Sequence, residues 1–396
     1  MLTVIIFLVV LAVLIFVHEL GHFLFAKMFG IRVDAFKIGF GPKIFAWTPH
    51  KKDGTKCETE YGLNLIPFGG YVKIFGENPD DTSTHGIEAE KRSMVHKPRW
   101  QQAIVLVGGV LFNFLFAAIL YIGLFSHGVT ATADGFPKYV QYFSNQRIMI
   151  TEVMPGFPAD KAGLKVGDVI RRVTSPDFQI PSGKTIENYF PLCGKVYCDE
   201  EPTNIGEIQG NIQSGEGKPV YVIYTRDTEM KAVQIVSVKD LVADKYAIGI
   251  AMNDVADMKL PFFIAVYEGG HYAVDTLKQT VVGLYSFAAQ AIHGTADYNQ
   301  ISGPVGIGKV VGDAARLGFT YLLMITALIS INLSVINLLP FPALDGGRIL
   351  FVAIESIIRR RIPAVFTNWV NVVGFGLLML LMVVVTYKDI VKLFVK

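Results

Sequence analysis

Cysteine and charge are both scarce in this chain of 396 residues. Three cysteines are too few to hold a fold of this length together with disulfides. Charged residues make up only 18%, and 36 Lys and Arg nearly balance 34 Asp and Glu, so the chain lacks the strong basic field of a nucleic-acid-binding protein. A hydrophobic content of 52% is too high for a disordered chain and argues against a purely soluble one.

The cysteines leave the presence of one disulfide open. Cys193 and Cys198 are close enough in sequence to pair if their segment lies in an oxidising compartment, whereas Cys57 has no near partner. Two free, packed thiols at positions 193 and 198 are an equally good interpretation. The spacing alone therefore does not decide between a disulfide and free thiols.

Long apolar runs are the strongest signal in the chain. Met1–Val17 contains neither charge nor glycine, and the apolar character resumes after His22. A helix needs about 20 residues to cross about 30 Å of hydrocarbon. A cleaved signal peptide would begin with positive charge and end in a small-residue cleavage site, so the run is interpreted as a retained span. Together with three further uncharged runs, this predicts an α-helical membrane protein with four transmembrane helices, at 1–26, 101–125, 319–341 and within 364–396.

Basic residues flank these spans unevenly and predict an orientation. Lys and Arg are frequent between the first two spans, in the segment 27–100, and none precedes the first span. Because basic loops are retained on the cytoplasmic side, this segment is placed inside and the N-terminus outside. Arg348 and Arg359–Arg361 also place the connection between the third and fourth spans inside, although lysines near the C-terminus favour the opposite. The long segment 126–318 then lies outside.

The outer segment has two parts. Between residues 147 and 241, short apolar strands alternate with polar turns, which predicts a compact β-rich domain within 126–255. A connecting segment follows at 256–318, and its residues 261–293 form an amphipathic pattern. This pattern predicts an amphipathic helix, which is suited to lie against a membrane or a protein surface rather than to cross the bilayer.

The inner segments carry glycines at positions that suggest tight backbone turns. In the region 27–100, glycines at 39–42 and 62–73 interrupt short apolar strands, which predicts hairpins able to dip toward the membrane. Irregular backbone is tolerated at that depth only where protein or a water-filled cavity satisfies it. The connection at 342–363 is predicted to be a loop.

The pentapeptide His18-Glu-Leu-Gly-His22 stands at the end of the first apolar run. Residues four apart share a face of a helix, so both imidazoles can bind one Zn²⁺, and Glu19 is placed to take a proton from a water that the metal activates. The alternative is a pair of helix-end histidines beside an exposed glutamate. Ionisable groups next to an apolar span cost free energy unless they are paired or ligated, which favours zinc.

A catalytic zinc site uses three protein ligands, and no third ligand follows the pentapeptide closely. Asp345, at the inner end of the third span, is the candidate. Pro340 and Pro342 break the helix there, and the glycine pair 346–347 is expected to let the backbone turn, so the carboxylate can point back at the metal. A helix cap within a loop is the alternative role for this carboxylate.

At these motifs the sequence resembles the site-2 protease family of intramembrane zinc metalloproteases, specifically its bacterial RseP/RasP type. The resemblance rests on four stretches in order along the chain: His18–His22, Gly69–Tyr71, Gly109–Asn113 and Asn332–Gly347. It implies one Zn²⁺ per chain, with His18, His22 and Asp345 as ligands and Glu19 as the general base.

The resemblance also implies how a substrate is held. Asn332 and Asn337 match positions that hold an unwound substrate segment near the metal, although hydrogen bonding between helices would explain either asparagine nearly as well. A re-entrant β-element would pair with substrate as an added strand. The glycine-rich hairpins at 39–42 and 69–73 resemble this element, and Gly69, Gly70 and Tyr71 are the residues expected to bind substrate. Gly109 and Asn113 are interpreted as helix-packing residues rather than catalytic ones.

The outer domain resembles a PDZ domain of this family, most clearly over Val153–Ile170. PDZ domains take up an extended chain along a sheet edge, so this domain is expected to bind or exclude substrate outside the membrane. A β-domain whose groove binds nothing is the alternative. The chain has room for one such domain, which is closer to the RasP-like arrangement. Residues 177–205, which contain both outer cysteines, match no PDZ pattern.

The implied protein is a multi-pass zinc metalloprotease of the bacterial inner (cytoplasmic) membrane, with its N-terminus and PDZ-like domain extracytoplasmic. Its expected substrates are single-pass membrane proteins, such as anti-sigma factors or signal-peptide remnants, cleaved within or near their transmembrane segments in regulated intramembrane proteolysis and stress response. The alternative is a catalytically inactive, membrane-anchored PDZ receptor with a structural metal site, but structural zinc is normally closed by four ligands. Metal-ion transport would require polar residues along several spans, and these spans have few.

Overall fold

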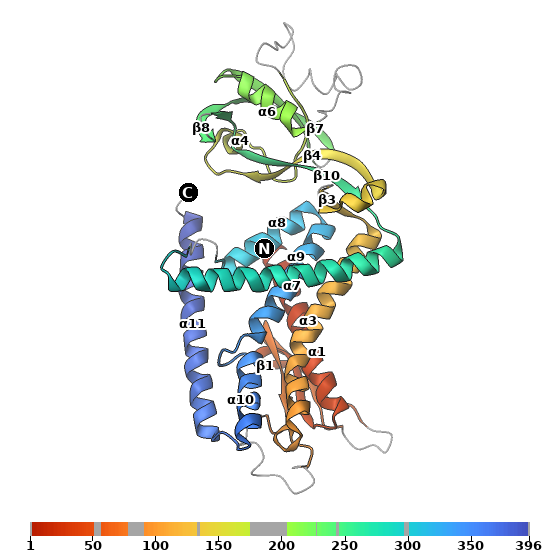
Figure 1. Cartoon of the computed structure of the whole chain (residues 1–396), viewed down its shortest axis with the longest axis vertical. Helices are drawn as coiled ribbons and strands as arrows, with labels where there is room; N and C mark the ends of the chain where they lie inside the picture. Colours follow the sequence, from red (N-terminus) through yellow and green to blue (C-terminus); the bar gives the residue numbers. More distant parts are fainter. Residues whose placement is uncertain are drawn as a thin grey trace. The chain divides into compact units, whose positions relative to one another are not determined.

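The computed structural model divides into two compact units, Met1–Leu124 with Phe262–Val395, and Phe125–Pro261 (Figure 1). Cys193 and Cys198, whose pairing the sequence leaves open, and nearly all of the segment 177–205 lie outside the residues that the structure describes. The described residues are 2–50, 57–77, 91–132, 135–174, 204–226, 228–242, 245–296 and 301–394.

Among the described residues, four helices are long and apolar enough to cross a membrane, and they lie where the four spans are predicted. They are α1 (Leu2–Met28), α3 (Arg99–His127), α9 (Phe319–Leu338) and α11 (Ala364–Phe394). Their most apolar stretches have mean hydropathies between 2.0 and 2.8. Large side chains such as Leu2, Val372 and Leu380 remain exposed on them, as expected where lipid rather than protein covers a helix.

Helices α1, α3 and α9 pack closely together near the C-terminal half of α1. A Cβ atom on Gly21 of α1 would lie 2.2 Å from the carbonyl oxygen of Gly108 on α3, so the two backbones meet at a point where only glycine fits. The hydroxyl groups of Ser330 and Ser334 on α9 each donate a hydrogen bond of 2.8 Å to a backbone carbonyl of α3. These contacts fix three helices around one buried position.

The described residues of the first unit contain three further α-helices: α7 (Phe262–Ile292), α8 (Pro304–Leu317) and α10 (Asp345–Ile358). Figure 1 shows α7 running across the direction of α3 and α11. It passes α3 where Gly269 lies against Ile122, and it contacts α9 through a 3.1 Å hydrogen bond from the Thr280 hydroxyl to Asn332 Oδ1. Helix α10 occupies much of the stretch that was predicted as a loop at 342–363.

The inner segment forms a two-stranded antiparallel sheet from β1 (Val33–Trp47) and β2 (Glu60–Ile74). Both strands bend sharply, because Gly39, Gly41 and Gly69 adopt positive φ angles of 83°, 83° and 97°. Residues 33–38 therefore pair with 70–74 on one side and with 60–63 on the other. This places residues 70–74 at an edge of the sheet, next to α1.

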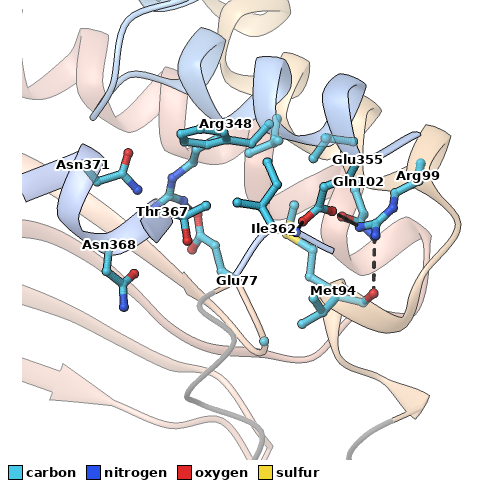
Figure 2. A pocket seen from close by; sticks show the side chains of 15 residues that line it. Glu77, Met94, Arg99, Gln102, Arg348, Glu355, Ile362, Thr367, Asn368 and Asn371 are labelled. Atoms are coloured by element: carbon cyan, nitrogen blue, oxygen red, sulfur yellow. Dashed lines mark hydrogen bonds and ion pairs between the residues drawn. The ribbon is translucent and has the colours of Figure 1, made fainter. Parts of the chain in front are cut away.

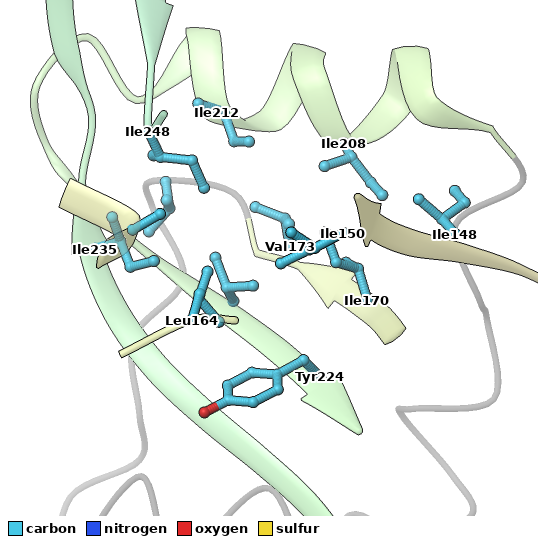
Figure 3. Packing of buried hydrophobic residues seen from close by; sticks show 13 residues of the cluster. Ile148, Ile150, Leu164, Ile170, Val173, Ile208, Ile212, Tyr224, Ile235 and Ile248 are labelled. Atoms are coloured by element: carbon cyan, nitrogen blue, oxygen red, sulfur yellow. The ribbon is translucent and has the colours of Figure 1, made fainter. Parts of the chain in front are cut away.

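The second unit is an antiparallel sheet with the order β3-β10-β4-β5-β6-β7, packed against α6 (Ile205–Ser214). Its strands are β3 (Val129–Thr132), β4 (Phe143–Val153), β5 (Val169–Val173), β6 (Pro219–Arg226), β7 (Glu229–Val236) and β10 (Ile250–Met258). A small sheet of β8 (Val238–Val242) and β9 (Lys245–Ala247) and the short helix α4 (Pro158–Lys161) accompany it. Figure 3 shows Ile208 and Ile212 of α6 directed toward Ile150 and Val173 of the sheet. The amphipathic α6 thus closes an apolar core.

Candidate metal centre and active site

The two histidines of the pentapeptide lie one above the other in the C-terminal half of α1. Both side chains are buried, at 8% and 7% exposure for His18 and His22, and their Nε2 atoms are 3.2 Å apart. The i, i+4 spacing on a helix produces this convergence, as the sequence predicts. The two Nε2 atoms face the same point.

Asp345 reaches that point from the other end of the chain. Its Oδ2 atom lies 3.0 Å from His18 Nε2 and 3.4 Å from His22 Nε2. Zinc in proteins binds nitrogen and oxygen at about 2.0–2.1 Å in tetrahedral geometry, which separates neighbouring ligand atoms by about 3.3 Å. The three donor atoms therefore fit three corners of a zinc tetrahedron, and among the described residues no fourth His, Cys, Asp or Glu donor joins this group.

The loop before α10 directs the Asp345 carboxylate in an unexpected way. The backbone turns at Ala343, which has a φ of 72°, and not at the glycine pair that was expected to turn it. Gly346 and Gly347 lie in the first turn of α10, where a Cβ atom would come within 2.1 Å of Leu339 O and 2.3 Å of Phe341 O. The glycines thus allow the helix to approach the loop backbone, which brings Asp345 to the histidines. The alternative of a capping role is not seen, because Leu344 is the N-cap residue and no side chain caps it.

Glu19 points from the same turn of α1 toward the β-sheet. Its Oε2 atom accepts a hydrogen bond of 2.9 Å from the backbone N–H of Val72 in the edge segment 70–74. The predicted substrate-binding residues Gly69, Gly70 and Tyr71 directly precede Val72, so the structure brings them to the candidate base. The segment packs tightly there, because a Cβ atom on Gly70 would lie 3.0 Å from the Ile15 side chain of α1.

The two asparagines predicted to hold substrate differ in position. The amide nitrogen of Asn337 lies 3.4 Å from His18 Nε2, next to the three converging atoms. Asn332, one and a half turns earlier on α9, accepts the hydrogen bond from Thr280 instead. This is the interhelical role that the sequence left open as its alternative. The substrate-binding roles of both residues stay predictions.

Helix α3 contributes residues to the site that the sequence analysis assigned to packing alone. A Cβ atom on Gly109 would lie 2.4 Å from His22 Nε2, so α3 approaches the imidazoles as closely as a helix can. The backbone carbonyl of Val105 lies 2.9 Å from His22 Nδ1, and the side-chain amide of Asn113 lies 3.2 Å from His18 Nδ1. The available signal was a polar side chain, Asn113, four residues after a glycine within an otherwise apolar span.

This set of donors, on helices suited to a bilayer, is the set expected of a membrane zinc metalloprotease. Comparison with known proteins gives the same class: the sequence profile of peptidase family M50 matches residues 6–381, and the chain belongs to this family. The resemblance to site-2 proteases is thereby confirmed. The chain is an integral membrane protein and a zinc metalloprotease.

Individual relatives match over nearly their whole length. A protein of Clostridium perfringens that carries a zinc metalloprotease name is 33% identical over 381 residues, which cover 96% of this chain and 95% of the relative. The zinc metalloproteases RasP of Oceanobacillus iheyensis and Geobacillus kaustophilus are 27% and 28% identical. The first alignment covers 100% of both chains, and the second covers 98% of this chain and 97% of the relative.

Proposed function

We propose that this protein hydrolyses peptide bonds within or near the transmembrane segments of single-pass membrane proteins. The observation that carries this proposal is the convergence of His18 Nε2, His22 Nε2 and Asp345 Oδ2 within 3.4 Å of one another, at the end of a helix whose preceding residues are suited to lipid. Ionisable groups at such a position are costly unless they serve a function. A protease centre there acts on chains that share the membrane.

Each residue of the centre has a distinct role in this proposal. His18, His22 and Asp345 hold the zinc ion, which supplies the Lewis acidity that activates water and polarises a carbonyl. Glu19 accepts the proton of the attacking water and delivers it to the leaving amine. The hydrogen bond from Val72 N–H orients the Glu19 carboxylate before substrate arrives. Asn337, beside the metal-binding atoms, is placed to donate to the substrate backbone.

A transmembrane helix must be unwound before its peptide bonds can be attacked, because its backbone hydrogen bonds are made internally. The edge segment 70–74 pairs with β1 on one side only and lies beside Glu19, which accepts the N–H of Val72; we propose that the remaining edge groups of the segment pair with an extended chain. The same sheet exposes large apolar side chains, including Ile44, Phe45 and Trp47 at 55–63% exposure. Such a surface favours a sheet that dips into the bilayer, where it meets the substrate at the depth of the metal.

Hydrolysis also requires water at this depth. A cavity of about 100 Å³ lies one turn of α10 beyond Asp345, and Figure 2 shows Arg348 of α10 reaching into it toward Glu77. Arg99 of α3 and Glu355 of α10 form an ion pair of 2.6 Å in the same cavity wall. Charged groups of this kind retain water, so the cavity supports a supply of water from the inner side.

The second unit is proposed to be a PDZ-like module that binds an extended peptide. Strand β3 pairs with residues 255–258 of β10, so among the described strands residues 250–254 pair with β4 alone. A cavity of about 200 Å³ is lined by Ile250 and Met252 of this edge, by β9 and by α6. A peptide added there would be held by main-chain hydrogen bonds, as in other strand-addition modules.

The basic residues of the inner segments support a bacterial inner-membrane protein whose N-terminus and second unit face outward. Anti-sigma factors and signal-peptide remnants are the substrates that we propose, with cleavage near the cytoplasmic side in regulated intramembrane proteolysis and stress response. The competing function, an inactive PDZ receptor with a structural metal, is less well supported because the described part of the chain brings three protein ligands together, fewer than the four of a typical structural zinc site.

Substitution Glu19→Gln tests the proposal. The variant should retain zinc and thermal stability in detergent but lose cleavage of a co-expressed single-span substrate, by roughly 10²–10⁴-fold if Glu19 acts as general base. Glu152→Gln, an exposed position in the second unit, is the matched control and should cleave normally. Undiminished cleavage by Glu19→Gln would refute the catalytic assignment, and absence of cleavage by the wild type would favour the receptor.

A further inference from the structure

The two zinc-binding histidines receive their second contacts from one helix but by different means. His22 Nδ1 lies 2.9 Å from the backbone carbonyl oxygen of Val105, whereas His18 Nδ1 lies 3.2 Å from the side-chain amide of Asn113. Both partners belong to α3. A backbone carbonyl is present whatever the residue, but the contact to His18 depends on the identity of one side chain.

The direction of these contacts determines which ring nitrogen carries the proton. A neutral imidazole has one N–H, so a histidine that gives Nε2 to a metal carries its proton on Nδ1 and must donate from there. Val105 O is a suitable acceptor for His22. For His18 the acceptor must be the Asn113 carbonyl oxygen, because the amide nitrogen can only donate.

The surroundings of Asn113 agree with this requirement. The side chain is fully buried, at 0% exposure, and its Oδ1 atom has no hydrogen-bond partner among the described residues. The oxygen and nitrogen of an amide exchange places by a rotation of 180°, and their assignment follows from the hydrogen-bond network. With Oδ1 toward His18, the oxygen gains a donor and the ring gains its acceptor, and the amide nitrogen takes the buried position where Oδ1 has no partner among the described residues.

We propose that Asn113 is a positioning residue of the metal centre. Its side-chain carbonyl accepts the hydrogen bond from His18 Nδ1–H and holds this imidazole in the tautomer and orientation that present Nε2 to zinc. The inference rests on the proposed metal centre and adds to it a residue that is not itself a ligand. The backbone carbonyl of Asn113 separately accepts a hydrogen bond of 2.8 Å from the Ser330 hydroxyl, which fixes α3 at this position.

The zinc dissociation constant of the purified full chain, measured by competition with a chelator near neutral pH, tests this role. Loss of an outer-shell acceptor typically weakens metal binding by 10–100-fold, and Asn113→Ala should do so. Asn113→Asp restores an acceptor in the same place, so its zinc affinity should be no more than about three-fold below that of the wild type. Gly123→Ala on the same helix, where an added Cβ atom meets no heavy atom within 4 Å, is the control and should leave zinc affinity unchanged.

Two further variants, Asn113→Leu and Asp345→Ala, distinguish the possible outcomes. Asn113→Leu fills a similar volume without an acceptor, and replaces Asn113→Ala if that variant does not fold. Zinc affinity of the alanine or leucine variant equal to that of the wild type would overturn the role of Asn113, and so would an equal loss in Asn113→Asp. Asp345→Ala distinguishes failure of the metal centre from failure of the role of Asn113. If Asp345→Ala keeps zinc, the proposed metal centre is wrong. If Asp345→Ala loses zinc but the Asn113 variants keep it, only the role of Asn113 is wrong.

Discussion

Gly109 allows α3 to lie against both imidazoles, so its replacement by alanine should disturb the metal centre. The added Cβ atom would lie 2.4 Å from His22 Nε2 and 2.6 Å from His18 Cε1. The first distance is about 1 Å short of the 3.4 Å at which ordinary contact begins. Overpacking of this kind costs roughly 1–3 kcal/mol, which corresponds to about 5–150-fold in zinc affinity if the strain is relieved by displacing the histidines.

The matched control is Gly123→Ala on the same helix. A Cβ atom at Gly123 meets no other heavy atom within 4 Å, so this variant should be neutral or gain up to about 1 kcal/mol from the higher helix propensity of alanine. Both variants are assayed in detergent for zinc retained after dialysis against a chelator and for the midpoint of thermal unfolding. If Gly109→Ala retained zinc and stability like Gly123→Ala, the close approach of α3 to the imidazoles would be wrong.

Three other predictions concern the metal and the second unit. Removal of zinc by a chelator should lower the unfolding midpoint and its return should restore it, because a ligand that binds only the folded state stabilises it; an unchanged midpoint contradicts this. The Asp168 carboxylate is 1% exposed and pairs with Arg226 at 2.6 Å. Arg226→Leu leaves this carboxylate buried without its ion-pair partner and should lower the free energy of chemical unfolding by about 3–5 kcal/mol. The double variant with Asp168→Asn should recover part of this loss. The hydrogen bond from Arg147 lowers the pKa of Asp257. The stability that this ion pair contributes is therefore complete above the ordinary Asp pKa of about 4 and is lost as the pH falls through the lowered pKa. Hydrogen exchange should show the difference in stability between the wild type and Arg147→Gln disappearing in that pH range.

The chemical identity of the site could be predicted from the sequence because its signals are local. The i, i+4 spacing of His18 and His22 places them on one face of any helix, and ionisable groups beside a long apolar run usually serve a function. Asp345 was found through the motif resemblance and the helix-breaking prolines before it. Its distance of 3.0 Å from His18 could not be predicted, since it depends on the packing of α10 against a loop.

The remaining features depend on contacts between distant segments. Residues 33–38 pair with two separate parts of β2, and no periodicity within either strand indicates this arrangement. Asn113 was assigned to helix packing because its partner, His18, lies on another helix. Asn332 and Asn337 are equivalent as sequence signals, but their positions on α9 direct one toward α7 and the other toward the histidines. In each case, tertiary packing decides between interpretations that local sequence leaves open.

X-ray absorption spectroscopy at the zinc edge of the purified chain tests the central claim most directly. We expect one zinc ion per chain, bound by two imidazole nitrogens and one carboxylate oxygen at about 2.0–2.2 Å, with the remaining position filled by water. In Asp345→Ala the carboxylate contribution should disappear and zinc occupancy should fall. An identical spectrum and full occupancy in that variant, or a sulfur ligand in the wild type, would contradict a centre formed by His18, His22 and Asp345.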